Sequence, residues 1–358
     1  MKIRKLNNAV ILPGCDLGLH YGGVVDENGE FVSGTDWQDM QCPHLYAYGD
    51  KNLVYRDDTI IYIGCLSRCW GHVITDSCKK LWYLYTEEAR RLLANGVKMV
   101  YITVGDEELP LYAKTMLQAA GVDMSLVEWI HGEPMRFREV IVPDSSFFLD
   151  EPQNNRIATL EYLQVIDHIK DYAENLYGNK VIPIDKIYFT RTSWTAGKDN
   201  GEQAVEELFA KYGYKIIAPE KMDTLEQIYL LAHCEEFVST EGSIGHNSVF
   251  CSPEAKVAIL KKADYENSYQ LVINTLIDFK FTYIPAHHSV RANKKGLYAG
   301  PFYVYPTKQL LEYLGESPEN YVPYWKRWSY WSYWIKEEKW VRKGRHFINR
   351  VVVDHKRM

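Results

Sequence analysis

KIYFTR (186–191), KIIAP (215–219), EFVST (236–240) and KVAILK (256–261) are four short apolar segments, and three helix-like segments separate them. Such an alternation of strand and helix predicts a parallel α/β sheet. Ligands of an open parallel sheet bind outside the carboxyl ends of its strands. We therefore expect a ligand-binding crevice at the residues that end or follow these strands, namely Arg191, Glu220, Glu241, Lys261 and Lys262.

The first half of the chain shows the same alternation. TIIYIG (59–64) and VYITVG (100–105) are typical of strands, and the residues from about 68 to 95 predict one long helix that stops at Gly96. Two α/β halves predict two Rossmann-like domains facing across a cleft, a common place for a small-molecule site. The expected division of the chain is 1–178, 179–290 and a C-terminal extension over 291–358.

Composition is typical of a soluble globular protein. The chain has 358 residues, of which 46% are hydrophobic and 25% charged, so two domains are the default expectation. No apolar run is long enough to span a bilayer and the N-terminus lacks a signal-peptide core, which predicts a cytoplasmic protein. Seven cysteines without a CxxC pair or a His-flanked spacing favour reduced thiols over disulfides or a zinc site.

The C-terminal segment carries a different charge from the rest of the chain. From Pro323 to Met358 there are ten Lys/Arg and three Asp/Glu, a net charge of +7, which leaves −13 for residues 1–322. On a helix, Tyr324, Trp328, Trp331 and Ile335 share one face. Such a basic aromatic helix suits a membrane interface with anionic lipid, and it equally suits a final helix packed back on the N-terminal domain. The acidic body and the lack of a binding motif argue against nucleic acid as a partner.

The predicted helix after Gly64 brings a histidine and a carboxylate together. His72 and Asp76 are one turn apart, on a face opposite the apolar side chains. A carboxylate beside an imidazole orients the ring and stabilises its charged form, so His72 is a candidate general base. The alternative is a solvated helix face with an ordinary i,i+4 ion pair.

Candidate anion-binding residues follow two strands of the second half. Arg191 and Lys198 would supply positive charge to a phosphate or diphosphate. The turn EGSIGHN is expected to open a short helix at Gly242 and Ser243, whose backbone amides would bind an anion. Glu241 is a candidate for sugar or ribose hydroxyls, and Ser243 or Asn247 for base, ribose or phosphate. Neither a GxGxxG fingerprint nor a P-loop is present.

Three blocks of the chain, between residue 59 and about 262, resemble glycosyltransferase family 61, which includes many bacterial capsular polysaccharide biosynthesis proteins. The family's motifs are a Gly-His followed by Asp-Ser, a Ser-Arg followed by Asn-Glu, and a Glu-Gln helix that leads to a His-Gly turn with a later Asn. The chain departs from them at Thr190 for Ser, Gly201 for Asn and Glu241 for His. The residues that match are Gly71, His72, Asp76, Ser77, Arg191, Glu202, Glu226, Gln227, Gly242 and Asn247.

The resemblance implies a GT-B architecture and inverting transfer from a nucleotide sugar, usually a UDP-sugar, to a hydroxyl of a growing surface glycan. It implies no cofactor besides this co-substrate and no metal site. The first domain would then bind the acceptor, with His72 or Asp76 as the base, and the second domain would bind the donor. A lipid-linked acceptor would suit association of residues 323–358 with the inner leaflet. The alternatives are a polysaccharide pyruvyltransferase that uses phosphoenolpyruvate, and a noncatalytic carbohydrate-binding or assembly protein on the same fold.

Overall fold

The computed structural model shows a chain of two compact units. Unit 1 comprises Met1–Ile182 together with Thr224–Ala232 and Ser268–Asp278, and unit 2 comprises the rest. The linear division at 178 and 290 stays a prediction. Among the described residues, no helix has the length and hydropathy that crossing a bilayer requires. The structure describes residues 1–14, 22–36, 53–103, 108–150, 155–193, 199–276, 280–288 and 301–337.

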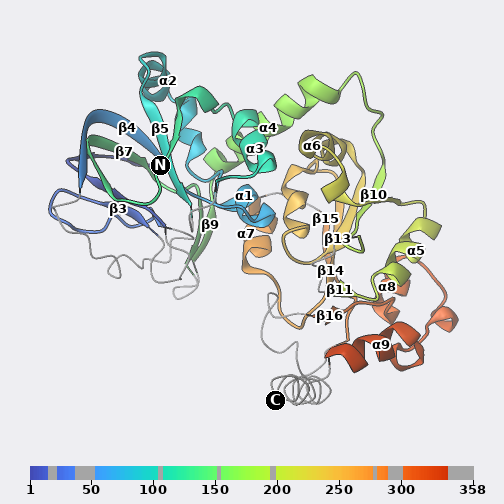
Figure 1. Cartoon of the computed structure of the whole chain (residues 1–358). Coiled ribbons are helices and arrows are strands. Elements are labelled where there is room, and N and C mark those ends of the chain that lie inside the picture. Colours follow the sequence, from blue (N-terminus) through green and yellow to red (C-terminus); the bar gives the residue numbers. More distant parts are fainter. Residues whose placement is uncertain are drawn as a thin grey trace, which may run out of the picture. The chain divides into compact units, whose positions relative to one another are not determined.

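Unit 1 contains a mixed sheet in the order β3-β2-β7-β4-β5-β6, with β1 paired to β7 (Figure 1). The neighbours β7, β4, β5 and β6 run parallel, whereas β1 and β2 run antiparallel to β7. A separate antiparallel pair is formed by β8 and β9. The strands are β1 (Ile3–Asn7), β2 (Val10–Leu12), β3 (Gly23–Val25), β4 (Val54–Leu66), β5 (Lys98–Thr103), β6 (Val127–Trp129), β7 (Met135–Pro143), β8 (Phe147–Asp150) and β9 (Asn155–Ala158).

The core of this sheet forms where β4 becomes continuously apolar. From Ile60 to Leu66 every β4 residue is buried, as expected for a strand with parallel neighbours and covered faces. Tyr62 packs in one cluster with Val100 of β5 and Phe137 of β7. Full burial of each such side chain contributes about 1.5–3 kcal/mol. The carboxyl end of β4 is therefore firmly packed, and it fixes the starting point of the residues that follow it.

The expected single helix over residues 68–95 is wrong. The segment forms three short pieces, α1 (Trp70–Thr75), the 3-10 turn η4 (Leu81–Tyr85) and α2 (Glu87–Ala94), and the Thr86 hydroxyl caps α2 by accepting from the Ala89 amide. The polar face is also not solvated, because Lys79 and Lys80 are both buried. Lys80 donates to the carbonyl of Pro143 at 2.8 Å. The polar face that the amphipathic pattern exposes to solvent is therefore buried, and Lys80 contacts β7 there. The other helices of this half are α3 (Leu111–Ala119), η5 (Met124–Leu126) and α4 (Leu160–Tyr177).

The sheet of unit 2 is entirely parallel, in the order β12-β10-β13-β14-β15. The predicted strands appear as β10 (Lys186–Phe189), β12 (Lys215–Ile217), β13 (Glu236–Thr240) and β14 (Lys256–Lys261), which confirms the α/β class. The edge strand β15 (Lys280–Pro285) has a half-exposed pattern and was not predicted. The helices between and after the strands are α5 (Gln203–Lys211), η6 (Pro219–Lys221), α6 (Thr224–His233), η7 (Gly245–Phe250) and α7 (Ser268–Leu276).

The C-terminal extension folds onto the sheet of unit 2. The short strand β16 (Phe302–Tyr303) pairs with β11 (Asp199–Asn200), and Leu310 of α8 (Lys308–Tyr313) joins the core under β13 and β14. The final helix α9 (Trp328–Glu337) packs on Tyr303 and Tyr305, and η10 (Pro318–Asn320) and η11 (Tyr324–Lys326) precede it. In the described part of the chain, Tyr330 and Tyr333 of α9 contact residues of unit 2. Packing of this helix on the N-terminal domain, or its docking at a membrane interface, stays a prediction.

Candidate active site

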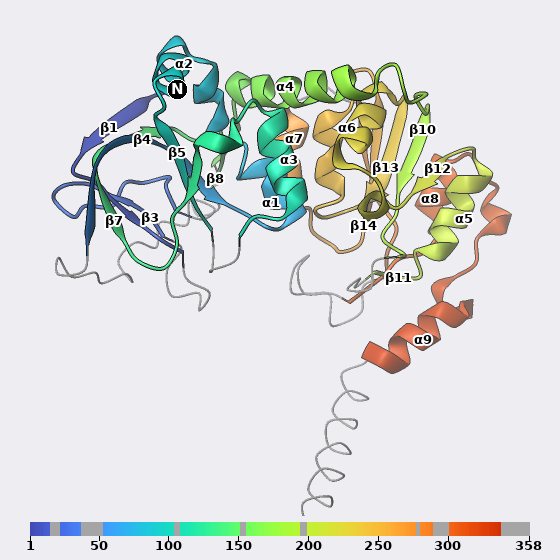
Figure 2. The same ribbon diagram turned by 45° about the horizontal axis from the view of Figure 1, so that its top comes forward.

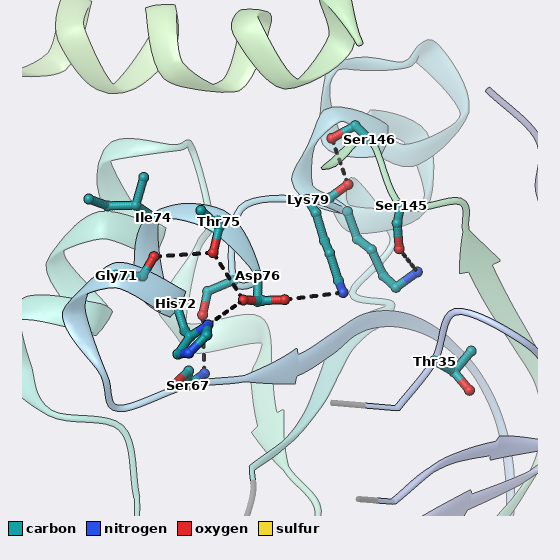
Figure 3. A network of polar contacts seen from close by, with 12 residues as sticks. Thr35, Ser67, Gly71, His72, Ile74, Thr75, Asp76, Lys79, Ser145 and Ser146 are labelled. Atoms are coloured by element: carbon teal, nitrogen blue, oxygen red, sulfur yellow. Dashed lines mark hydrogen bonds and ion pairs between the residues drawn. The ribbon is translucent and has the colours of Figure 1, made fainter. Parts of the chain in front are cut away.

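His72 and Asp76 form a direct pair at the carboxyl end of β4. His72 lies in the first turns of α1, and Asp76 ends that helix with its amide bonded to the His72 carbonyl at 2.8 Å. The Nδ1 atom of His72 is 2.7 Å from Oδ2 of Asp76 (Figure 3). The carboxylate is buried with 4% of its side chain exposed, whereas the imidazole retains 22%. The pair therefore presents its histidine, and not its carboxylate, to a ligand.

The surroundings of Asp76 keep it ionised. Burial on its own would raise the pKa of the carboxyl, but the charge of Lys79 and the hydrogen bonds from His72 and Thr75 outweigh it, so the pKa lies below its ordinary value. Lys79 Nζ is 3.5 Å from Oδ1, and the Thr75 hydroxyl donates to Oδ2 at 3.0 Å. An ionised carboxylate can only accept, so Nδ1 of His72 carries the proton in this pair. The basic lone pair of the neutral ring is then on Nε2.

Three hydrogen bonds hold this segment in place. The Ser77 hydroxyl accepts from the amide of Ser67 at 3.2 Å, which ties the end of α1 to the turn that leaves β4. The Gly71 carbonyl accepts from the Thr75 hydroxyl at 3.2 Å. The Lys79 carbonyl accepts from the Ser146 hydroxyl at 2.8 Å (Figure 3). The matched Gly-His and Asp-Ser positions are thus a tightly bonded unit around the imidazole.

Tyr269 completes the surroundings of His72. Its ring lies edge-on to the imidazole, with 5.3 Å between the ring centroids and 83° between the planes. Phe147 stacks with Tyr269, with 6.0 Å between the ring centroids. Tyr269 belongs to α7, almost 200 residues away in the sequence, yet it lies in the same unit as His72. Nothing in the local sequence identifies Tyr269, because a tyrosine on a helix is ordinary.

In unit 2, Arg191 follows β10 and is held by its backbone. Its amide lies 3.3 Å from both carboxylate oxygens of Glu202, which also accepts from the Tyr188 hydroxyl at 2.9 Å. Burial, with the nearby charge of Asp199 next, raises the pKa of Glu202 to about 7. Among the described residues, the Arg191 guanidinium forms no hydrogen bond or ion pair. The sequence matched Glu202 to the family but did not predict that it positions Arg191.

Glu241 is completely buried at the carboxyl end of β13. One carboxylate oxygen accepts from the amide of Asn267 at 2.7 Å, and the other, Oε2, has no hydrogen-bond partner among the described residues. Burial raises the pKa of this carboxyl to about 7, against the lowering effect of the Asn267 amide and of Lys261 and Lys262. A sugar contact by Glu241 stays a prediction, because this side chain reaches no surface in the structure.

The turn after Glu241 is not the expected helix start. Gly242 has φ +114°, a conformation that favours glycine, and the Gly245 amide bonds to its carbonyl at 2.8 Å. The following 3-10 helix η7 begins only at Gly245 and has six residues. The amides of Gly242 and Ser243 therefore do not belong to a helix N-terminus. Asn247 is buried, and its side-chain amide donates to the carbonyl of Ile244 at 2.8 Å, so it stabilises the turn.

A buried ion pair lies beside this turn. Lys262 Nζ is 3.0 Å from Asp199 Oδ2, and both side chains are almost inaccessible, with 3% and 2% exposed. Lys262 also lies over the ring of Phe302, at 4.9 Å from its centroid. A Cβ atom at Gly242 would lie 3.7 Å from Nζ, so the glycine leaves room beside the ammonium group. Lys198 lies outside the described residues. Groups of three or more residues able to hold a metal ion do not occur in the described ranges.

Comparisons with known proteins give the family. Two solved structures are similar over most of the chain at low identity: the iron-containing dodecameric glycosyltransferase TibC from enterotoxigenic E. coli H10407 (13% identity, 80% of this chain, 79% of that one, TM-score 0.29) and the heptosyltransferase TibC in complex with ADP-D-β-D-heptose (12%, 81%, 81%, TM-score 0.28). Such scores carry no structural argument. No curated protein matches. The family model Glycosyltransferase 61 matches residues 70–258, more than half of the chain, and this range includes His72, Arg191 and Glu241 but not Lys262. The chain therefore belongs to glycosyltransferase family 61 and is a glycosyltransferase.

Proposed function

We propose that the chain transfers a sugar from a nucleotide-sugar donor, a UDP-sugar, to a hydroxyl of a growing surface glycan of the capsular or exopolysaccharide type, with inversion at the anomeric carbon. The observation that carries this proposal is the His72 and Asp76 pair, in which an ionised, buried carboxylate holds a partly exposed imidazole at 2.7 Å. This arrangement supplies a base for an acceptor hydroxyl, which a single displacement requires.

The roles of the two residues follow from their environments. The acceptor hydroxyl gives its proton to Nε2 of His72 as its oxygen bonds to the anomeric carbon, and the nucleoside diphosphate leaves with the electron pair. Asp76 stabilises the imidazolium that forms. The lowered pKa of Asp76 makes its carboxylate a weak base, and its burial keeps it from the acceptor. These two facts support His72 as the base and Asp76 as the residue that orients it.

On the donor side, Arg191 is the residue best supported for the diphosphate. Glu202 holds the backbone amide of Arg191, while the guanidinium forms no hydrogen bond or ion pair with the described residues. A guanidinium matches the geometry of phosphate oxygens and can stabilise the charge on the leaving group. Gly242 and Ser243 would line the donor site next to Lys262, and Lys198 completes the proposed set. A GT-B arrangement of the two units, catalysis without a metal and a cytoplasmic location are parts of this proposal.

A transfer assay with the purified chain tests the proposal. A panel of UDP-, GDP- and CDP-sugars with glycan acceptors should show transfer from one UDP-sugar. His72→Ala should lower kcat by about 10²–10⁴-fold, the usual contribution of a general base, and leave donor affinity nearly unchanged. Thr86→Ala, which removes the cap of α2 outside this hydrogen-bonded unit, serves as a structural control. Normal turnover in His72→Ala would rule out its role, and thermal stabilisation by phosphoenolpyruvate instead of UDP would favour pyruvyl transfer.

A further inference from the structure

Four large apolar side chains near the end of unit 2 are exposed to solvent. Trp325, Trp328, Trp331 and Ile335 have 52%, 82%, 43% and 47% of their surface accessible, and we call them the aromatic ridge. Trp328, Trp331 and Ile335 are spaced three and four residues apart, so they share one face of α9. Figure 2 shows α9 as the last coloured helix of the chain. Large apolar side chains grouped on one exposed face mark an interaction surface more often than scattered ones do.

The rest of α9 fixes the ridge to the body of unit 2. Tyr330 and Tyr333 are buried in one cluster with Tyr303 and Tyr305. The Tyr333 hydroxyl donates to the carbonyl of Pro301 at 3.0 Å. Trp331 is itself held, because its indole N–H donates to the Trp325 carbonyl at 2.7 Å. The helix therefore already buries its packing face, and the ridge is a second face that this packing leaves uncovered.

The charges of the ridge segment and of the sequence that follows it indicate what covers it. Lys326 and Lys336 lie in the ridge segment itself, and residues 338–358 add seven Lys/Arg against two Asp/Glu in the sequence. Tryptophan is enriched where a membrane meets water, because its ring is apolar and its N–H is polar. Basic residues add attraction to anionic lipid, and stable peripheral binding takes two such signals together. A second copy of the chain would instead bring two +7 segments together, which repulsion disfavours.

We propose that the aromatic ridge docks the protein on an anionic lipid surface, with Trp328 and Ile335 entering the interface and the basic residues beside them contacting the headgroups. One face of α9 would then pack on the protein, and the opposite face would contact the membrane. The inference stands on the exposure and charge of α9, so it does not depend on which sugar the enzyme transfers.

Vesicle sedimentation with the full-length chain tests the docking. Vesicles of phosphatidylcholine alone are compared with vesicles of equal parts phosphatidylcholine and phosphatidylglycerol, at low and high salt. We expect binding to the anionic vesicles that weakens as salt screens the charges. Trp328→Ser/Ile335→Ser should lower the partition coefficient by roughly tenfold or more, since each side chain loses apolar burial. Neither side chain forms a hydrogen bond within the described part of the chain, so the fold should tolerate the change.

The control is a pair of exposed apolar residues elsewhere. Leu160 and Ile182 are 79% and 86% exposed, so Leu160→Ser/Ile182→Ser removes as much exposed apolar surface without touching the ridge. This variant should bind vesicles like the unaltered chain. Equal loss in both double variants, or no binding of the full chain to anionic vesicles, overturns the proposal. So does concentration-dependent dimerisation in sedimentation velocity that only the ridge variant abolishes, because the ridge would then cover a second copy. Transfer between soluble substrates should be unchanged, which separates this inference from the proposed chemistry.

Discussion

Tyr269 lies edge-on against His72, with 5.3 Å between the ring centroids. Asp76 holds one edge of the same imidazole through Nδ1, so the ring is fixed by a hydrogen bond and by an aromatic contact at once. Asn267, two residues before Tyr269, gives its amide to the buried carboxyl of Glu241. The segment that Asn267 ties to Glu241 therefore continues, two residues later, to Tyr269, which contacts the proposed base. Tyr269 is in this sense a positioning residue for His72.

Tyr269→Ala should lower kcat by about twofold to tenfold, because an edge-to-face pair contributes roughly 0.5–1.5 kcal/mol. KM for the donor should change little, since the contact is made in unit 1 with the base. Steady-state kinetics in both substrates measures this split. The matched variant Tyr269→Phe keeps the ring and removes only the hydroxyl, so it should restore most of the lost kcat. An equal defect in both variants would contradict a role for the ring.

Arg191→Ala should weaken UDP binding by about tenfold or more, because a charge-assisted hydrogen bond to phosphate contributes on the order of 1.5–3 kcal/mol. Calorimetry with UDP measures the effect directly. Lys215→Ala is the control, since Lys215 is an exposed cation at the opposite, amino-terminal end of β12. Unchanged UDP affinity in Arg191→Ala would remove this residue from the diphosphate site.

Lys262→Met should destabilise the protein by about 3–5 kcal/mol, because it leaves Asp199 as a buried charge without its partner. Replacing both members, as Lys262→Met/Asp199→Leu, should recover much of that loss. Denaturant unfolding of the single and double variants gives the comparison. If the single variant has the same free energy of unfolding as the unaltered chain, the ion pair between Lys262 and Asp199 does not stabilise the fold.

The sequence was informative where periodicity and chain order decide structure. Strands β13 and β14 were predicted to the residue, because a buried parallel strand is a continuous apolar run between turn signals. The prediction of one helix over 68–95 failed because Lys79 and Lys80 are buried. The ammonium group of Lys80 has its partners in β7 and the loop after it, and that of Lys79 lies beside Asp76. A helical wheel treats such residues as solvent-facing, so it cannot find a segment that tertiary contacts surround.

The site was predictable in part for the same reason. His72 and Asp76 are one helical turn apart, and local spacing was enough to bring them together. Tyr269 comes from a distant helix, so only the fold places it at the imidazole. The Gly242 turn was expected to start a helix, but residues 241–244 form a bend and a turn, and the helix begins at Gly245. A short-range sequence pattern does not distinguish such a turn from a helix N-terminus. Which residues share a strand edge is readable from sequence; how each turn is shaped is not.

Glu241 predicts a pH dependence of stability. Its pKa is raised from 4.5 to about 7, so the folded state favours the protonated carboxyl. The stability from this group is complete below pH 4.5, declines as the pH rises and is lost once the pH passes about 7. The decline is on the order of 3 kcal/mol for a shift of this size. The charged groups that act on the carboxyl are Lys261, Lys262 and Glu266.

Glu241→Gln removes this titration while an amide oxygen still accepts from the Asn267 amide. The variant should therefore lose less stability than the unaltered chain between pH 5 and pH 8, as measured by the free energy of unfolding in denaturant at each pH. Glu202 is also buried, with a pKa raised to about 7, and it remains in both proteins, so the difference between them isolates Glu241. Parallel pH profiles for the two proteins would contradict a raised pKa of the Glu241 carboxyl in the folded state.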